Sequence, residues 1–161
     1  MSERFQSRYP DAASSPGLAL WHVANAWQRT MRAALSPHDL THTQFVLLAM
    51  LTATAPDQLV TQRDLAGAAG TDEMMTSNVL RALESKKLIQ RSPHPKDGRA
   101  VALTPTSAGI NLVRKANHDV ESADETYFAA LDEPQRASLL NALHLLRNRS
   151  PEPDHSVGTS A

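Results

Sequence analysis

The chain contains no cysteine among its 161 residues, which excludes disulfide bonds and thiolate metal sites. We also expect no targeting or anchoring segment. The first residues have no apolar stretch like that of a signal peptide, and no uncharged apolar run approaches the length of a membrane span. We therefore expect a cytoplasmic protein with no membrane partner, long enough to form one domain with its own core.

Motifs for common enzyme chemistry are also missing. The sequence has no glycine-rich phosphate loop, no nucleophile elbow and no metal-binding signature. His38 and His42 are four residues apart, and His118 and His144 fall on expected helices, but no pattern such as His-Glu-x-x-His adds a carboxylate. We expect no enzyme activity, cofactor or metal; a regulatory metal held by these histidines is the alternative.

The net charge of −1 has little excess of either sign, but the charges are unevenly distributed. Residues 63–115 carry nine basic and five acidic side chains, a net charge of +4, whereas residues 116–161 carry three basic and eight acidic ones, a net charge of −5. This asymmetry is typical of a chain whose middle meets phosphate while its end faces elsewhere. Chance clustering on a solvated surface is the alternative.

A β-hairpin is the clearest short-range feature. Asp97-Gly98 separates two apolar runs, Leu88-Ile89 and residues 100–103, and glycine takes the positive φ that a tight hairpin turn requires. The turn would lift Lys96 and Arg99 away from the body of the protein. Arg99 would enter a narrow minor groove, with Asp97 orienting its guanidinium; an ordinary solvated turn is the alternative.

Two helices precede this hairpin. Thr61 caps a short helix through Ala69, Gly70 supplies a turn, and residues 72–86 form the next helix. Helical spacing gives that helix a buried face of Thr76, Val79, Leu80 and Leu83. The side chains directed outward are then Met74, Met75, Ser77, Asn78 and Arg81. A short helix, a turn, an outward polar helix and a basic hairpin make a winged helix–turn–helix, which binds duplex DNA.

The outward residues suit a reader of the major groove. Ser77 and Asn78 can bond base edges, and Arg81 can reach a phosphate or a guanine. Met74 and Met75 would contact thymine methyls, or else serve only in packing. Thr61 and Gln62 begin the short helix that crosses the DNA backbone and complete the expected DNA-contacting set.

Four further helices make about six in all. The first spans residues 17–35, and the second begins at Thr41 with Gln44 completing a capping box. Thr104-Pro105 would open a long helix with proline at its first position, and Asp132 would cap the last one. Its apolar seam is Leu139, Leu140, Leu143 and Leu146. The fold class is mainly α with a small β-hairpin wing.

Apolar stripes on both terminal helical regions favour a homodimer, with packing within one chain as the alternative. We expect disordered tails over residues 1–16 and 149–161 and a domain over 17–148. Within it, the DNA-binding lobe is about 41–104, and the dimerisation helices are 17–35 and 105–148.

The chain resembles the MarR (multiple-antibiotic-resistance regulator) family of bacterial transcription factors over roughly residues 17–148. The resemblance is carried by Leu40 to Leu48, Val60 to Ala66, Asp72 to Arg91, and Asp97-Gly-Arg99 leading to Leu103-Thr104. Lys87 stands where the family often has glycine, His94 where an acid is common, and Gly98 where an arginine is common.

This resemblance implies a homodimer on a pseudo-palindromic operator of double-stranded DNA, usually repressing its own or neighbouring genes. It also implies release by a small ligand, often an aromatic acid, or by an oxidant; without cysteine, the thiol switch of some members is excluded. The ligand pocket that it implies would be lined by Trp21, His22, Asn25, Arg29, His42 and Phe45. A core role for Trp21 and a simple capping role for either histidine are the alternatives.

The leading hypothesis is therefore a dimeric, ligand-responsive repressor. The alternative is a winged-helix protein-interaction or assembly module without DNA binding, which the net charge of −1 favours.

Overall fold

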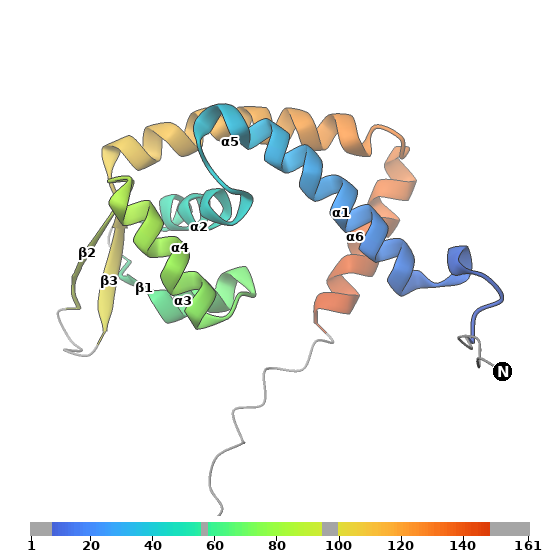
Figure 1. The fold of residues 1–161 in the computed structure, drawn as a ribbon, viewed down its shortest axis with the longest axis horizontal. Helices are drawn as coiled ribbons and strands as arrows, with labels where there is room; N and C mark the ends of the chain where they lie inside the picture. The colour runs from blue at the N-terminus through green and yellow to red at the C-terminus, as the bar shows by residue number, and fades with distance from the viewer. Residues whose placement is uncertain (1–7, 56–57, 95–99, 149–161) are drawn as a thin grey trace, which may run out of the picture. The chain divides into compact units, whose positions relative to one another are not determined.

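The computed structural model describes residues 8–55, 58–94 and 100–148. Its helices are α1 (Pro16–Leu35), α2 (His42–Ala53), α3 (Gln62–Ala69), α4 (Glu73–Ser85), α5 (Ser107–Phe128) and α6 (Glu133–Arg147) (Figure 1). The strands are β1 (Val60–Thr61), β2 (Ile89–Pro93) and β3 (Val101–Pro105), in the order β1-β3-β2. The predicted fold class, helical with a small β wing, is confirmed. The chain divides into two compact units, with the boundary between Asp124 and Glu125 inside α5.

Local capping fixes where most helices begin, as the sequence predicts. The Thr41 hydroxyl accepts from the Gln44 amide at 3.2 Å, and the Gln44 side chain accepts from the Thr41 amide at 3.1 Å. Thr61 caps α3 and Asp132 caps α6 with the same reciprocal pattern. Each such cap satisfies two backbone donors that the first helical turn leaves free.

Two expected boundaries change. Residues Ala12–Ser14 form a short 3-10 helix, η1, capped by Asp11, within the segment expected to be tail. Pro105 is not the first residue of a helix but the last residue of β3, where it pairs with Ile89. α5 starts two residues later because the Thr106 hydroxyl caps it, accepting from the Gly109 amide at 3.0 Å.

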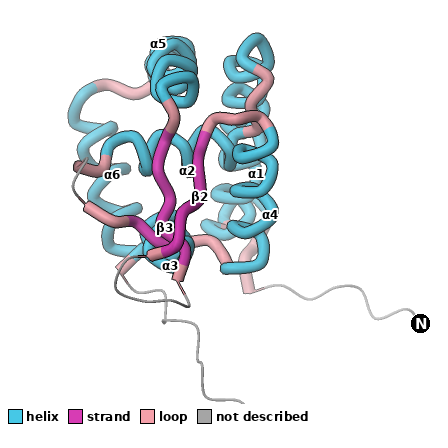
Figure 2. The backbone as a smooth tube through the Cα atoms, turned by 90° about the vertical axis from the view of Figure 1, so that its left-hand side faces the viewer, coloured by secondary structure: helices cyan, strands magenta, loops and turns pink. Residues whose placement is uncertain are grey.

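The hairpin is antiparallel as expected, and β2 and β3 run side by side (Figure 2). Its register pairs Arg91 with Leu103. The tip residues Lys96, Asp97 and Arg99 lie outside the described residues, so their roles stay predictions. The third strand, β1, was not expected: Val60 pairs with Leu103, and two residues are too short to show strand periodicity.

The core of the first unit is built around α2. Leu47 and Leu48 of α2 are fully buried, and they belong to one cluster with Leu35 of α1 and Leu80 and Leu83 of α4. α2 contacts α1, α3, α4 and β3 and so lies at the centre of this unit, as expected for a helix whose residues 45–51 are all apolar. Each large aliphatic side chain buried in this way contributes roughly 1.5–3 kcal/mol.

The end of α4 is fixed by its own turn and by α5. The Leu88 amide donates to the Leu83 carbonyl at 2.9 Å and the Lys87 amide to the Glu84 carbonyl at 2.8 Å, a Schellman motif that places Lys87 at a φ of 58°. The Thr106 hydroxyl then donates to the Lys87 carbonyl at 2.8 Å. The start of α5 therefore holds the end of α4.

Candidate nucleic-acid interface

A tight turn joins α3 to α4. Gly70 takes a φ of 65°, which glycine adopts without steric cost, and the Thr71 amide donates to the Ala66 carbonyl at 3.0 Å. The hydroxyls of Thr71 and Thr76 lie 2.8 Å apart. Thr76 is fully buried and also donates to the Asp72 carbonyl at 2.8 Å, so this polar group inside the turn is satisfied. The geometry between the two helices is thus set by hydrogen bonds as well as apolar packing.

The outer face of α4 is exposed as predicted. Met74 is 77% exposed and Met75 40%, Asn78 and Arg81 are also exposed, and Ser77 is half-buried. Arg81 Nη1 donates to Asn78 Oδ1 at 3.3 Å, one helical turn away. The opposite face of α4 packs into the core. The side chains that face solvent are therefore the ones that a groove of DNA could accommodate.

Thr61 and Gln62 serve the joint between α3 and α4. The Thr61 hydroxyl donates to Asp64 Oδ2 at 2.7 Å, and hydrogen bonds from Thr61 lower the pKa of Asp64 below its ordinary value. Gln62 Nε2 donates to the Glu73 carbonyl at 3.2 Å, at the start of α4. These two polar groups are held in place by neighbours within the protein.

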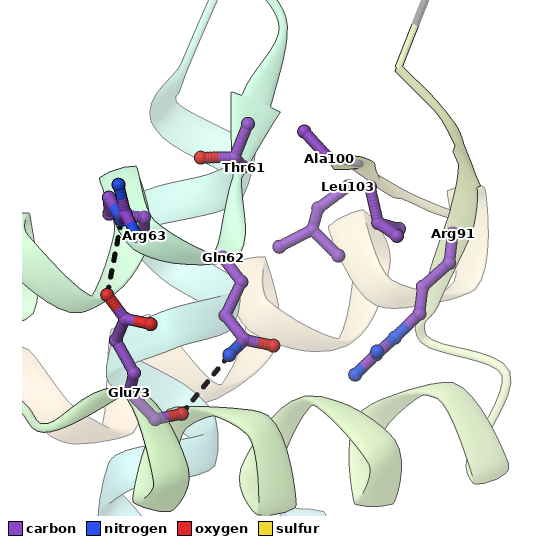
Figure 3. A pocket seen from close by; sticks show the side chains of 8 residues that line it. Thr61, Gln62, Arg63, Glu73, Arg91, Ala100 and Leu103 are labelled. Atoms are coloured by element: carbon purple, nitrogen blue, oxygen red, sulfur yellow. Dashed lines mark hydrogen bonds and ion pairs between the residues drawn. The ribbon is translucent and has the colours of Figure 1, made fainter. Parts of the chain in front are cut away.

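A cavity of about 420 Å³ lies where the starts of α3 and α4 meet the wing strands (Figure 3). Its lining residues are Thr61, Gln62, Arg63, Glu73, Arg91, Ala100, Val101 and Leu103. Figure 3 shows the Arg91 side chain extending from its strand toward Gln62 and α4. The cavity therefore brings polar groups of both helices and the wing together.

Arg91 is the residue of this site that the sequence analysis missed. Its Nε lies 3.2 Å from Glu84 Oε2, which makes an ion pair, although the N–H is not aligned for a hydrogen bond. Its Nη2 is buried and has no hydrogen-bond partner among the described residues. A basic residue within the expected wing strand was the available signal, but strand alternation alone does not say which face it occupies.

The carboxylates on α4 near this cavity are paired with cations. Arg63 Nε lies 3.2 Å from Glu73 Oε1, and Glu84 pairs with Arg91. These pairs are exposed or partly exposed and add little stability. They offset negative charge that would otherwise repel a phosphate backbone.

The expected ligand residues do not all meet in one cavity. Trp21 is 60% exposed, with its ring 5.0 Å from that of His22, and Arg29 is exposed. Phe45 is in the core. Asn25 and His42 do line one cavity, of about 710 Å³, with nine other residues: Gln28, Arg32, Ser36, Asp39, Leu40, Thr41, Thr43, Gln44 and Lys86.

Trp27, rather than Trp21, makes the polar contact in this region. Its Nε1 donates to Asp124 Oδ1 at 2.6 Å, and its ring lies 5.0 Å from the His42 ring, edge to face. Burial lowers the pKa of His42, an effect that the negative charge of Asp124 opposes. Helical spacing puts Trp27 on an apolar face of α1 with Leu20 and Met31, but such spacing gives no sign of a partner 97 residues away.

His38 and His42, which the sequence offers as possible metal ligands, contact other side chains of the protein. His38 Nε2 lies 2.6 Å from Asp119 Oδ2, while His42 packs on Trp27. Over the part of the chain that the structure describes, no group of three or more acidic, histidine or cysteine side chains could hold a metal ion. Over the same residues, no helix is long and apolar enough to cross a membrane.

A short helix, a glycine turn, an exposed polar helix and an adjoining β-hairpin define the class of winged helix–turn–helix DNA-binding proteins. The model of the MarR family matches residues 40–101, which span α2, the helix–turn–helix and the start of β3.

Relatives extend the match across most of the chain. The chain is 42% identical over 127 residues to YdcH of Bacillus subtilis, an uncharacterized HTH-type transcriptional regulator, covering 78% of this chain and 86% of that one. It is 31% identical over 130 residues to an HTH-type transcriptional repressor of Mycobacterium tuberculosis, covering 81% and 91%. Among solved structures, the Staphylococcus aureus MepR–DNA complex superposes with a TM-score of 0.77 at 26% identity, covering 83% and 97%.

The chain belongs to the MarR family. It is a DNA-binding transcriptional regulator and not an enzyme.

Proposed function

We propose that the chain is a homodimeric repressor that binds a pseudo-palindromic operator near its own or neighbouring genes and is released by a small ligand. The observation that carries the DNA-binding part is the exposed polar face of α4 beside a basic wing strand. The repressor of Mycobacterium tuberculosis, 31% identical, supports the sign of regulation.

In this proposal α4 lies in the major groove. Ser77 and Asn78 bond base edges, Arg81 reaches a phosphate or a guanine, and Met74 and Met75 contact thymine methyls. Thr61 and Gln62 position the start of α3 against the DNA backbone.

The wing supplies cations. Arg91 contributes a guanidinium that pairs with Glu84 and lines the cavity between α4 and the wing, with its side chain 23% exposed. Lys96 and Arg99, oriented by Asp97, would contact phosphate and the minor groove, a role that rests on the sequence alone.

The Asn78→Ala and Arg91→Ala variants test these contacts by different signatures. Asn78→Ala is expected to relax discrimination at one base pair by roughly 1–3 kcal/mol, because it removes a proposed base contact and no cation. Arg91→Ala is expected to weaken binding to the selected and the scrambled duplex alike, because it removes a cation from the wing. The slope of log affinity against log salt concentration is expected to fall by about one if that cation neutralises a phosphate.

Fluorescence anisotropy measures the DNA affinity of both variants. The duplexes are the strongest one recovered by genomic selection and a scrambled one, each at a series of salt concentrations. Asn141→Ala, on the exposed side of α6, is the control and is expected to leave affinity unchanged. Unchanged affinity for both duplexes in both variants would contradict the groove assignment.

The proposed effector is a small aromatic carboxylate. Supporting it, the 710 Å³ cavity carries Arg32, His42 and Asn25, which can pair with a carboxylate, and Trp27 packs on His42 beside it. Trp21, His22, Arg29 and Phe45, from the pocket that the family resemblance implies, remain proposed ligand contacts from the sequence.

Tryptophan fluorescence during a salicylate titration tests the ligand. We expect quenching in the wild type and at least about a fivefold weaker response in Arg32→Gln, the variant that removes the cation able to pair with a carboxylate. His22→Ala is assayed in parallel, and Arg114→Gln, exposed on α5, is the control. No quenching, or equal quenching in all variants, would count against this site.

A further inference from the structure

The connector between α1 and α2, residues 36–40, contacts two different helices through adjacent side chains. It contains a short 3-10 helix, η2 (Ser36–His38), followed by Asp39 in the left-handed region at a φ of 52°. His38 bonds to α5, and Asp39 bonds to the residue that caps α4. One turn of chain therefore links the long helix α5 with the proposed recognition helix.

The Asp39 contact involves both side chain and backbone. Lys86 Nζ donates to Asp39 Oδ2 at 2.9 Å and also to the Asp39 carbonyl oxygen. Aspartate tolerates the left-handed conformation better than most residues, and here that conformation accompanies two acceptors on one ammonium. Lys86 is the C-cap of α4, so this contact fixes the end of that helix.

The His38 contact is shorter and more buried. His38 Nε2 lies 2.6 Å from Asp119 Oδ2, and the His38 side chain is only 14% exposed. The bond from His38, followed by that from His118, lowers the pKa of Asp119, which keeps the carboxylate charged. The connector is thus attached near the middle of α5.

α5 also holds α4 directly, at its first turn. The Thr106 hydroxyl donates to the Lys87 carbonyl at 2.8 Å, and the Thr106 amide to the Leu88 carbonyl at 3.0 Å. Asp119 lies about 20 Å further along α5, at 1.5 Å per residue. α4 is therefore linked to α5 in two ways, once directly and once through the connector.

We propose that His38 and Asp39 are positioning residues for DNA recognition: through Asp119 and Lys86 they hold α4 in the orientation that reads the operator. The proposal rests on the proposed function, in which α4 enters the major groove. Asp39 is 93% exposed, and exposed ion pairs add little stability, so the contact acts on orientation rather than on folding. Orientation matters because base contacts demand placement within about 0.5 Å.

The test pairs each disrupting variant with a conservative one. Lys86→Met removes both bonds to Asp39 but keeps an apolar stem, whereas Lys86→Arg keeps donors and charge. His38→Leu removes the bond to Asp119, whereas His38→Gln keeps an N–H donor. Asp39→Asn is a third disrupting variant: it removes the charge that pairs with Lys86 and preserves tolerance of the left-handed conformation.

Anisotropy is measured for the full-length protein on the duplex recovered by genomic selection and on a scrambled duplex of the same composition. We expect each disrupting variant to bind the selected duplex about fivefold more weakly and to bind the scrambled duplex with unchanged affinity. The reason is that the orientation of α4 affects base contacts and not phosphate attraction. The arginine and glutamine variants are expected to restore affinity to within about twofold.

The double variant His38→Leu/Lys86→Met decides whether the two contacts act as one link. We expect it to lose no more affinity than the weaker-binding single variant, because either change already frees the connector. Losses that multiply, equal losses on both duplexes, or unchanged affinity would each overturn the proposal. Wild-type protein that does not prefer the selected duplex would instead contradict the proposed function, and melting curves of every variant identify any that fails to fold.

Discussion

Among the described residues, two that are not glycine adopt left-handed backbone: Asp39, which bonds to Lys86, and Lys87, which follows Lys86 in the chain. Asp39 has a φ of 52° and Lys87 a φ of 58°. A short polar side chain such as that of aspartate tolerates this region, whereas lysine gains nothing there. Lys87 is exposed and its conformation is imposed by the Schellman motif at the end of α4. The strain at Lys87 is thus a local cost of ending the helix with this residue.

At the residue scale, Lys87→Gly is expected to stabilise the fold. Glycine removes left-handed strain of roughly 1–2 kcal/mol, and the greater freedom of the unfolded chain offsets roughly 0.4–1 kcal/mol of that. The net gain in unfolding free energy is about 0.5–1 kcal/mol, measured by urea denaturation. Lys87→Ala is the control for charge, because it removes the ammonium and keeps the strain. An equal gain in both variants would contradict this explanation.

At the scale of elements, the first turn of α5 is the point where the wing, α4 and the core meet. Thr106 caps the helix and bonds to the turn after α4, and Gly109 packs directly against it. A Cβ added to Gly109 would overlap the Leu88 carbonyl oxygen and lie 3.3 Å from Leu48 Cδ1. Glycine is required at this position by close backbone approach, not by its dihedral angles.

Gly109→Ala is therefore expected to destabilise the protein by up to about 2 kcal/mol, because overpacking against backbone costs roughly 1–3 kcal/mol and helix propensity returns only roughly 1 kcal/mol. Urea denaturation of this variant is compared with that of Gly67→Ala. Gly67 lies in α3, and a methyl group added there would have no atom within 4 Å, so that substitution is expected to be neutral or stabilising. A Gly109→Ala variant as stable as the wild type would contradict the contact.

At the scale of the whole molecule, apolar side chains remain exposed on the terminal helices. Leu140, Leu145 and Leu146 of α6 are each more than half exposed, and α6 has no buried residue. On α1, Leu20 and Trp21 are likewise more than half exposed. Exposed apolar side chains on each of the two helices are typical of an interaction surface, and they support the proposed homodimer.

The double variant Leu140→Glu/Leu146→Glu tests the dimer, because each change places a charge on the proposed apolar seam of α6. We expect a monomer in sedimentation velocity and at least about a tenfold loss of operator affinity, because one protomer reaches only one half-site. Asn141→Glu adds a charge to the same helix on the side opposite the seam and is expected to leave the dimer intact. A wild-type protein that sediments as a monomer would contradict the proposal outright.

Features that depend on near neighbours along the chain could be predicted from the amino-acid sequence. Capping residues such as Thr41 and Thr61 lie three positions from their partners, and the buried face of α4 repeats with the helical period, so helix starts and faces could be predicted. The hairpin followed from its turn for the same reason.

Contacts between side chains far apart in the sequence could not be predicted in this way. Lys86 and Asp39 are 47 residues apart, His38 and Asp119 81, and Trp27 and Asp124 97. Local periodicity carries no information on such pairs, because packing of separate helices and strands, not the backbone near each residue, brings them together. For the same reason, the sequence did not predict β1 or the inward direction of the Arg91 side chain: both depend on contacts with residues distant in the chain.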